Sequence, residues 1–140
     1  MDVKTAFLIG MIEEKVYIKQ PEGFETLDCE LHVCRLKRAL YGLKKAPHAW
    51  YTRIDSYFTR LGFMKSEADA NLYHIVVEGK LLIIVLYVDD LMMTSDENLI
   101  KSCKEDLARE FEMKDMGLMH YFLGMEVWRG DGELFVSQGK

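Results

Sequence analysis

The longest uninterrupted apolar stretch of this 140-residue chain is residues 81–88, and two aspartates, Asp89 and Asp90, follow it directly. Eight apolar residues are far fewer than the roughly 20 that a membrane-spanning helix needs. Because the stretch is rich in leucine, isoleucine and valine, it predicts a core β-strand that is buried on both faces. Such a strand carries both carboxylates to its end, which is the strongest constraint that the sequence places on the fold.

The two adjacent aspartates allow two interpretations. Asp is a common turn residue, because it hydrogen-bonds its own backbone and tolerates the left-handed conformation. Alternatively, two carboxylates about 4 Å apart repel by roughly 1 kcal/mol in water and by several times that in a protein, so a divalent cation would relieve a conflict. Asp2 favours the cation, since it precedes another β-prone stretch and would meet Asp89 and Asp90 if the two strands were neighbours. Three such carboxylates suit Mg²⁺ or Mn²⁺, and a pair of ions assists phosphoryl transfer.

The remaining hydrophobic pattern predicts strands interrupted by two helices. Apolar residues, among them the expected core anchor Trp50, recur at helical spacing from Pro47 until Gly62, and again after a cap at Ser95 or Asp96. Strands are expected at residues 3–8, 16–19, 30–36, 72–77, 81–88, 91–93, 121–127 and 134–136, with turns at residues 78–80 and 130–132. This order predicts one α+β domain, an antiparallel sheet with helices on one of its faces.

Composition and charge narrow the function classes. With 49% hydrophobic residues the chain has enough apolar material for a core, which excludes disorder. Three cysteines without C-x-x-C spacing indicate neither a disulfide framework nor a zinc site, and favour a reducing compartment. The net charge of −5 argues against a simple nucleic-acid binder, but residues 35–65 carry eight Lys or Arg and one Asp. That basic segment suits either a solvated helix face or an enzyme acting on a polyanion.

Six blocks of this sequence resemble the reverse transcriptase of copia-type LTR retrotransposons, in the order in which that family has them. The most specific contains Tyr87-Val88-Asp89-Asp90. The blocks are residues 1–8, 16–24, 40–47 with Trp50, 86–90, 111–117 and 121–127. One four-residue motif would be weak evidence, whereas six collinear blocks make coincidence negligible. The resemblance implies a polymerase palm with part of the fingers over residues 1–140, without the N-terminal fingers, the thumb and the RNase H domain.

The resemblance also implies a catalytic site. Asp2, Asp89 and Asp90 match the catalytic aspartates of the family, and together with the backbone carbonyl of Val3 they would hold two Mg²⁺ or Mn²⁺ ions. A primer 3′-hydroxyl bound to one ion would attack the α-phosphorus of a deoxynucleotide, while the other ion neutralises the leaving pyrophosphate. The turn interpretation of the aspartates becomes the minor one.

Further residues are matched to substrate contacts. Phe7 corresponds to the aromatic gate that excludes a ribose 2′-hydroxyl, Tyr41 and Gly42 would lie against the template and the nascent base pair, and Lys114 lies near a lysine proposed as general acid. Residues 121–127 resemble the primer grip. An ordinary core role for Phe7 and a solvated role for any single basic residue stay open. The residues expected to contact nucleic acid are Arg35, Lys37, Arg38, Lys44, Lys45 and Tyr87.

The expected function is therefore that of an RNA-directed DNA polymerase fragment in retrotransposition. Its partners would be a primed RNA or DNA template, deoxynucleoside triphosphates and the remaining Pol polyprotein domains, with no membrane. The family implies an intracellular location, in a cytoplasmic particle or in the nucleus. Because much of the substrate-holding machinery is expected to be missing, the isolated fragment would be inactive. The alternatives are an inactive retrotransposon remnant that at most binds nucleic acid, and a magnesium-dependent nuclease that uses the same carboxylates.

Overall fold

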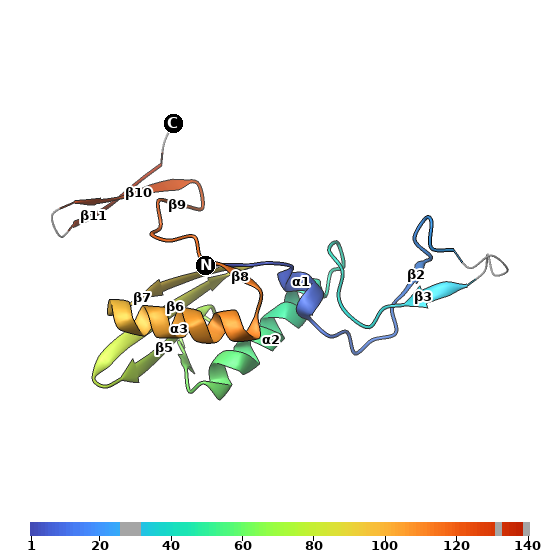
Figure 1. The fold of residues 1–140 in the computed structure, drawn as a ribbon, viewed down its shortest axis with the longest axis horizontal. Helices are drawn as coiled ribbons and strands as arrows, with labels where there is room; N and C mark the ends of the chain where they lie inside the picture. The colour runs from blue at the N-terminus through green and yellow to red at the C-terminus, as the bar shows by residue number, and fades with distance from the viewer. Residues whose placement is uncertain (26–31, 131–132, 139–140) are drawn as a thin grey trace.

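A six-stranded antiparallel sheet forms the main body of the protein. The computed structural model describes residues 1–25, 32–130 and 133–138 (Figure 1). The strands run in the order β4-β5-β6-β7-β1-β8. They are β1 (Asp2–Val3), β4 (Met64–Lys65), β5 (Leu72–Val77), β6 (Lys80–Tyr87), β7 (Asp90–Thr94) and β8 (Met113–Lys114). The helices are α1 (Ala6–Ile9), α2 (Ala46–Arg60) and α3 (Glu97–Glu110). The antiparallel α+β arrangement is thus confirmed.

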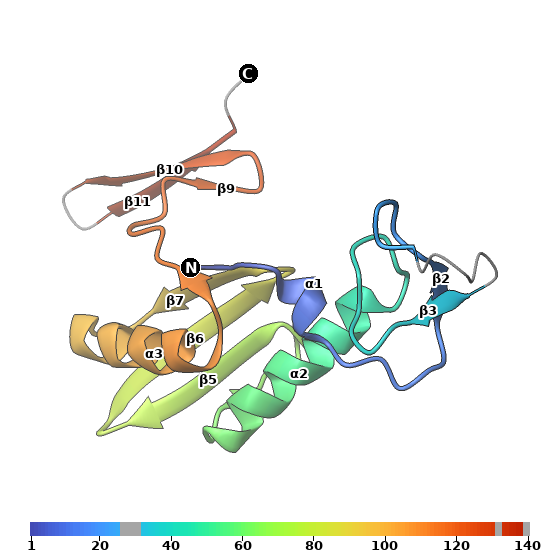
Figure 2. The same cartoon turned by 45° about the vertical axis from the view of Figure 1, so that its right-hand side comes forward.

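Both long helices cover the same face of this sheet (Figures 1 and 2). On β6, the side chains of Leu82, Ile84 and Leu86 are at most 3% exposed and belong to the core that α2 and α3 complete. The side chains between them point to the opposite face, where Leu81 is 49% exposed. The prediction that this strand is buried on both faces was wrong, because a single layer of helices covers a single face.

Helix α2 forms where the sequence predicted it. Pro47 lies in its first turn, and the recurring apolar residues Trp50, Ile54 and Phe58 are each at most 2% exposed. The helix ends before Gly62, which takes a φ of +87° that residues with a side chain rarely adopt. The buried stripe seats the helix on the sheet, and Trp50 is a core residue, as expected.

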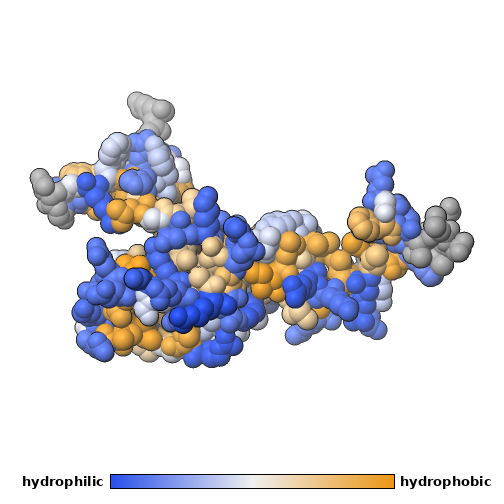
Figure 3. Space-filling model, in the orientation of Figure 1, coloured by the Kyte–Doolittle hydropathy of each residue, from blue (hydrophilic) through white to orange (hydrophobic). Residues whose placement is uncertain are grey.

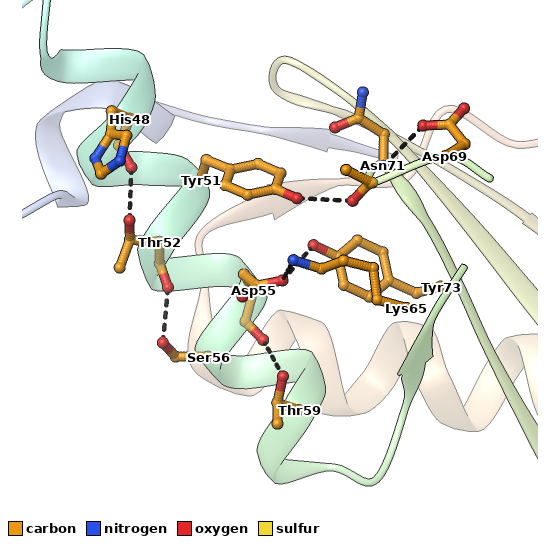
Figure 4. Close-up of polar contacts among 11 residues, drawn as sticks. His48, Tyr51, Thr52, Asp55, Ser56, Thr59, Lys65, Asp69, Asn71 and Tyr73 are labelled. Carbon is orange, nitrogen blue, oxygen red and sulfur yellow. Dashed lines mark hydrogen bonds and ion pairs between the residues drawn. The ribbon is translucent and has the colours of Figure 1, made fainter. Parts of the chain in front are cut away.

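Helix α2 is tied to β4, to β5 and to the segment between them by polar contacts (Figure 4). The Tyr73 hydroxyl donates to Asp55 Oδ1 at 2.7 Å, and Lys65 Nζ lies 2.5 Å from the same oxygen. Tyr51 donates its hydroxyl to the Ala70 carbonyl at 2.7 Å. Burial alone would raise the pKa of Asp55, but the hydrogen bonds from Lys65 and Tyr73 outweigh it and lower that pKa below its ordinary value. The helix is therefore fixed in position by both packing and charge.

The turns and caps of the main body follow the sequence closely. The β5–β6 hairpin turns through Glu78 and Gly79, both with positive φ, as the predicted turn at residues 78–80 requires. Of the two candidate caps of α3, Asp96 is the one used, and its carboxylate accepts the Asn98 N–H at 3.0 Å. These predictions are confirmed.

The predicted strand at residues 3–8 was wrong. Thr5 has a φ of 55°, which turns the chain out of β1, and α1 follows at once. Ala6 is 1% exposed within the core, and Gly10 lies so close to α2 that a Cβ there would be 2.7 Å from the Ala49 Cβ. Tertiary packing of a short apolar segment against α2 has overridden its β propensity.

Two small sheets project from the main body (Figures 1 and 2). One is β2 (Tyr17–Lys19) with β3 (Val33–Arg35), and we call described residues 11–25 and 32–45 the N-terminal arm. The other, the C-terminal unit, contains β9 (Tyr121–Phe122), β10 (Met125–Gly130) and β11 (Glu133–Ser137). The expected strand at residues 121–127 is split by a turn with positive φ at Leu123 and Gly124. Parts of the expected strand at residues 30–36 and of the turn at residues 130–132 lie outside the described residues.

Candidate active site

The turn between β6 and β7 presents the two adjacent aspartates. Val88 and Asp89 form this turn, and Asp90 opens β7. Val88 has a φ of 56°, a conformation that is a genuine outlier for a β-branched residue. Asp89 is half-buried and Asp90 is exposed. The carboxylates therefore lie at the end of a core strand, as the sequence predicted.

Strand β1 lies directly beside this turn. Asp2 is the antiparallel register partner of Asp90, which places their Cα atoms about 5 Å apart. The Val3 N–H donates to the Asp89 carbonyl at 2.9 Å, which ties β1 to the turn itself. The expected neighbour relation between Asp2 and the two later aspartates is confirmed, although 87 intervening positions separate Asp2 from Asp90 in the sequence.

The register places four predicted site residues on one face of the sheet. Tyr87 pairs with Asp90, Asp90 with Asp2, and Asp2 with Lys114. Directly opposed residues in an antiparallel ladder point to the same side. The adjacent pair of Leu86 and Leu91 faces the core, so these four side chains line the face that the helices leave uncovered. The helices therefore lie on the opposite side of the sheet from these four residues.

The electrostatics of this face suit a cation. Partial desolvation raises the pKa of the Asp90 carboxyl above its ordinary value, and the negative charges of Asp89 and Asp2 raise it further. Carboxylate oxygens are the ligands that Mg²⁺ prefers, so the donor set fits a divalent ion in chemical type. In residues 1–25, 32–130 and 133–138, no group of three or more Asp, Glu, His or Cys side chains converges as a ready-made metal site. The carboxylates are neighbours that repel one another, and they are not yet a ligand cage.

The two aromatic residues matched to nucleotide binding lie together. The rings of Phe7 on α1 and Tyr41 meet edge to face, with their centroids 5.2 Å apart. Phe7 is half-buried and packs against the core, while Tyr41 is 56% exposed. Gly42 has a φ of +88°, so the chain turns sharply after Tyr41. These residues come from segments more than 30 positions apart and form one small aromatic surface next to α2.

The predicted phosphate-contacting residues do not join the aspartates. Arg35 lies on β3 of the N-terminal arm, which both ribbon views show away from β1 and β7 (Figures 1 and 2). Lys37 and Arg38 follow β3, where the chain runs back toward the main body, and Lys44 and Lys45 directly precede α2. Lys45 forms an ion pair with Glu14. All five side chains are exposed, so the structure leaves them available to a polyanion but separate from the carboxylates.

Two contacts of the site were missed by sequence reasoning. The indole of Trp50 donates its N–H to the Val88 carbonyl at 2.6 Å. The Tyr87 ring packs edge to face on Phe122 of β9, with centroids 5.9 Å apart, and so connects the site to the C-terminal unit. The signal for the first was the buried tryptophan itself, because its N–H needs an acceptor. The second had no sequence signal.

Comparison with known proteins identifies the family. The reverse transcriptase (RNA-dependent DNA polymerase) family matches residues 1–140. The retrovirus-related Pol polyprotein from transposon TNT 1-94 of Nicotiana tabacum is 42% identical over all of this chain, and that from transposon RE1 of Arabidopsis thaliana is 41% identical over 99% of it. A putative transposon Ty5-1 protein of Saccharomyces cerevisiae is 33% identical over 98% of it.

The chain spans less than half the length of each of these relatives. The chain spans 11% of the tobacco polyprotein, 10% of the Arabidopsis one and 45% of the yeast protein. No solved structure matches the fold. In the described part of the chain, no helix is long and apolar enough to cross a membrane. By sequence over its whole length, this chain belongs to the reverse transcriptase family of retrotransposon Pol polyproteins.

Proposed function

We propose that the main body is the palm of an RNA-directed DNA polymerase and that Asp2 and Asp89 are its metal ligands. The observation that carries this proposal is the antiparallel register of β1 and β7, which sets Asp2 against Asp90 and ties Val3 to Asp89. It brings together carboxylates that lie far apart in the matched sequence, with Asp2 and Asp90 on the face of the sheet that the helices leave uncovered. The family membership supplies the reaction class, because reverse transcriptases extend a primer on a template.

The chain's own residues would hold and orient the reactants. Two bound Mg²⁺ or Mn²⁺ ions would supply an activated primer 3′-hydroxyl and charge neutralisation of the pyrophosphate. Asp2 and Asp89 would hold these ions, with Asp90 beside them as a further negative charge and the Val3 backbone as a further oxygen donor. Lys114, the register partner of Asp2, would donate a proton or a hydrogen bond to the leaving group. The carboxylates themselves would form no covalent intermediate.

The aromatic surface of Phe7 and Tyr41 would receive the incoming nucleotide. Phe7 packs against the core and against the Tyr41 ring, so its ring is held in place and would resist a 2′-hydroxyl sterically. Gly42 would let the chain turn close to the nascent base pair. We therefore expect Phe7→Ala to raise the kcat/KM for ribonucleotides relative to deoxyribonucleotides in an active polymerase. Unchanged selectivity would return Phe7 to a purely structural role.

Template and primer would be contacted by the exposed basic residues of the N-terminal arm and by Tyr87. Tyr87 is 45% exposed on the same face as Asp90, and it reaches toward the C-terminal unit, which we propose as the primer grip. Template and primer could thus run across the uncovered face. The remaining domains of a Pol polyprotein would then enclose the template and primer against this face.

Metal-dependent stability tests the proposed site without requiring catalysis. A ligand that binds only the native state raises the melting temperature. We expect Mn²⁺ to raise the melting temperature above that in chelator, and Asp89→Asn to abolish the shift. Glu105→Gln on the exposed surface of α3 removes the same charge and is the matched control. A shift that survives in Asp89→Asn contradicts the metal site.

Catalysis is tested in a completed domain. The chain would be joined to the flanking segments of the related tobacco polyprotein, and extension of a primed template would be measured. Asp2→Asn and Asp89→Asn are expected to reduce extension by several orders of magnitude, because each removes a ligand charge. Asp90→Asn should cost less. Near-normal extension by Asp89→Asn would contradict the polymerase assignment of this site, and cleavage of a labelled duplex without nucleotides would favour a nuclease.

A further inference from the structure

Trp50 is joined directly to the turn that presents the aspartates. Its side chain is 2% exposed, and its indole N–H donates to the Val88 carbonyl at 2.6 Å, across 38 positions of sequence. A buried indole N–H without an acceptor would cost free energy, so this bond links the position of α2 to the position of the turn. The turn also contains the most unusual backbone conformation of the site, the positive φ of Val88.

The position of this acceptor matters because of peptide geometry. The Val88 carbonyl and the Asp89 N–H belong to one planar peptide unit. A donor that fixes the carbonyl therefore fixes the plane from which the Asp89 backbone starts. On its other side, the Asp89 carbonyl accepts the Val3 N–H at 2.9 Å. The backbone of Asp89 is held from both sides, by Trp50 before it and by β1 after it.

Trp50 is itself held rigidly. Its ring meets Phe111 edge to face with centroids 5.5 Å apart. The backbone of Gly10 lies against α2 at the same level, since a Cβ on Gly10 would be 3.0 Å from the backbone nitrogen of Trp50. Further along the helix, Asp55 is bound by Tyr73 and Lys65 (Figure 4). The indole donor therefore has little freedom to follow the turn if the turn relaxes.

Val88 needs such a restraint. A β-branched residue in the left-handed region is strained, and such strain persists only where surrounding contacts over-determine it. Without the hydrogen bond, the peptide between Val88 and Asp89 could rotate toward an ordinary conformation. That rotation would redirect the side chain of Asp89, the residue that precedes Asp90 and whose carbonyl is bonded to Val3.

We propose that Trp50 is a positioning residue for Asp89: its indole N–H holds the Val88–Asp89 peptide and thereby sets the direction in which the Asp89 carboxylate leaves the turn that β1 adjoins. The proposal rests on the proposed function, since it gives the orientation of Asp89 a purpose in binding divalent ions. Trp50 touches no reactant and acts only through the turn. It couples the packing of α2 to the geometry of the carboxylates.

The chain contains its own control, because it has two tryptophans. Trp128 on β10 is 62% exposed, and its indole N–H reaches only Glu126 Oε2 at 3.3 Å. Trp50→Phe keeps an aromatic ring but removes the donor, and Trp128→Phe makes the same change away from the site. Both are made in the whole 140-residue chain, and Mn²⁺ is the probe.

We expect Trp50→Phe to weaken Mn²⁺ binding by about tenfold or more, the effect typical of groups that orient a metal ligand, and Trp128→Phe to leave it unchanged. The amide resonances of Val88, Asp89 and Asp90 should shift in Trp50→Phe alone. Val88→Asn should partly restore Mn²⁺ binding to Trp50→Phe, because Asn tolerates a positive φ better than Val. A purely structural role for Trp50 would show no such rescue.

The possible failures are distinguishable. Mn²⁺ binding that persists in Asp89→Asn contradicts the proposed function. Binding that is lost in Asp89→Asn but unchanged in Trp50→Phe overturns only the role of Trp50, as do unchanged amide resonances at residues 88–90. If Trp50→Phe does not fold, the unsubstituted chain decides by hydrogen exchange of the two indoles. Slow exchange at Trp50 and fast exchange at Trp128 support the bond, and equally fast exchange overturns it.

Discussion

The main body and the two projecting units differ in what holds them together. Every residue of the core cluster lies in or beside the six-stranded sheet, α1, α2 and α3. In the described part of the N-terminal arm only Ala39 is buried, and in the described part of the C-terminal unit only Val127. The surface view shows apolar side chains exposed on both projecting units (Figure 3).

The proposed metal ligands and the proposed nucleic-acid contacts therefore lie on regions of different stability. Asp2, Asp89 and Asp90 stand on a layer that has its own core, whereas Arg35 stands on a ribbon whose β3 side chains are all exposed. Exposed apolar residues such as Val33 and Phe135 mark surfaces that a partner could cover. The carboxylates can therefore be positioned by this chain alone, while the contacts to nucleic acid depend on what packs against the two units.

Hydrogen exchange should show the largest contrast between these regions. Amides of β5 and β6 pair within the core sheet and open only with global unfolding, whereas those of β3 can open locally. We expect exchange in β6 to be about a thousandfold slower, or more, than in β3. Mass spectrometry of peptide fragments measures it. Comparable rates in the two strands would show that the arm shares the stability of the body.

A matched pair of phenylalanine substitutions should sharpen the same comparison. Phe58 is fully buried under the sheet, and Phe135 on β11 is 54% exposed. Phe58→Ala should lower the free energy of unfolding by about 3–5 kcal/mol, because it removes a large side chain and leaves a cavity. Phe135→Ala should change it by about 0.5 kcal/mol or less. Urea denaturation measures both, and equal losses would break the distinction.

The main body was also the region that the sequence could predict. The spacing of apolar residues predicts a helix such as α2, and the turn residues predict the β5–β6 hairpin, because both signals are local patterns. From the sequence alone the neighbour relation of Asp2 and Asp90 is only conditional, since strand pairing across 87 intervening positions leaves no local trace. The role of these aspartates as metal ligands stays a prediction.

The errors have a common physical cause. The segment after Val3 was expected to continue as a strand because it is apolar, yet Thr5 turns it and α2 packs on Ala6 and Gly10. Burial of β6 on both faces was expected from its composition, although a second layer is a property of the whole fold. The bond from Trp50 to Val88 joins two such distant elements. The sequence pattern does not indicate which distant segment each element packs against.

The polar anchor of α2 gives a prediction of intermediate size, with a defined pH dependence. The folded state lowers the pKa of Asp55 below 3.8, through Lys65 and Tyr73, so this group stabilises the fold above about pH 4 and the contribution is lost as pH falls through the lowered value. Asp55→Asn should cost about 1–2 kcal/mol at pH 7. The cost should shrink toward pH 2.

Asp106→Asn is the control for this anchor, because Asp106 pairs with Arg109 at the surface, three positions along α3. Its cost should be about 0.5 kcal/mol or less at any pH. Urea denaturation at pH 7 and pH 2.5 measures both variants. A pH-independent cost of Asp55→Asn would mean that the carboxylate contributes through packing and that its charge is unimportant.

The smallest expected effect concerns the arm. Lys45 is bound by Glu14, so a phosphate must compete with that carboxylate for it. Glu14→Gln should therefore strengthen binding of a nucleic acid duplex a few-fold, while the neighbouring Glu13→Gln, with the same charge change, should do less. Lys45→Gln should reduce the slope of log K against log salt by about 0.9 if it contacts one phosphate. A salt titration of duplex binding measures all three variants. If Glu14→Gln and Glu13→Gln behave alike and the slope is unchanged in Lys45→Gln, then Lys45 is an anchor of the arm, and the grip on nucleic acid must come from other residues or from a partner domain.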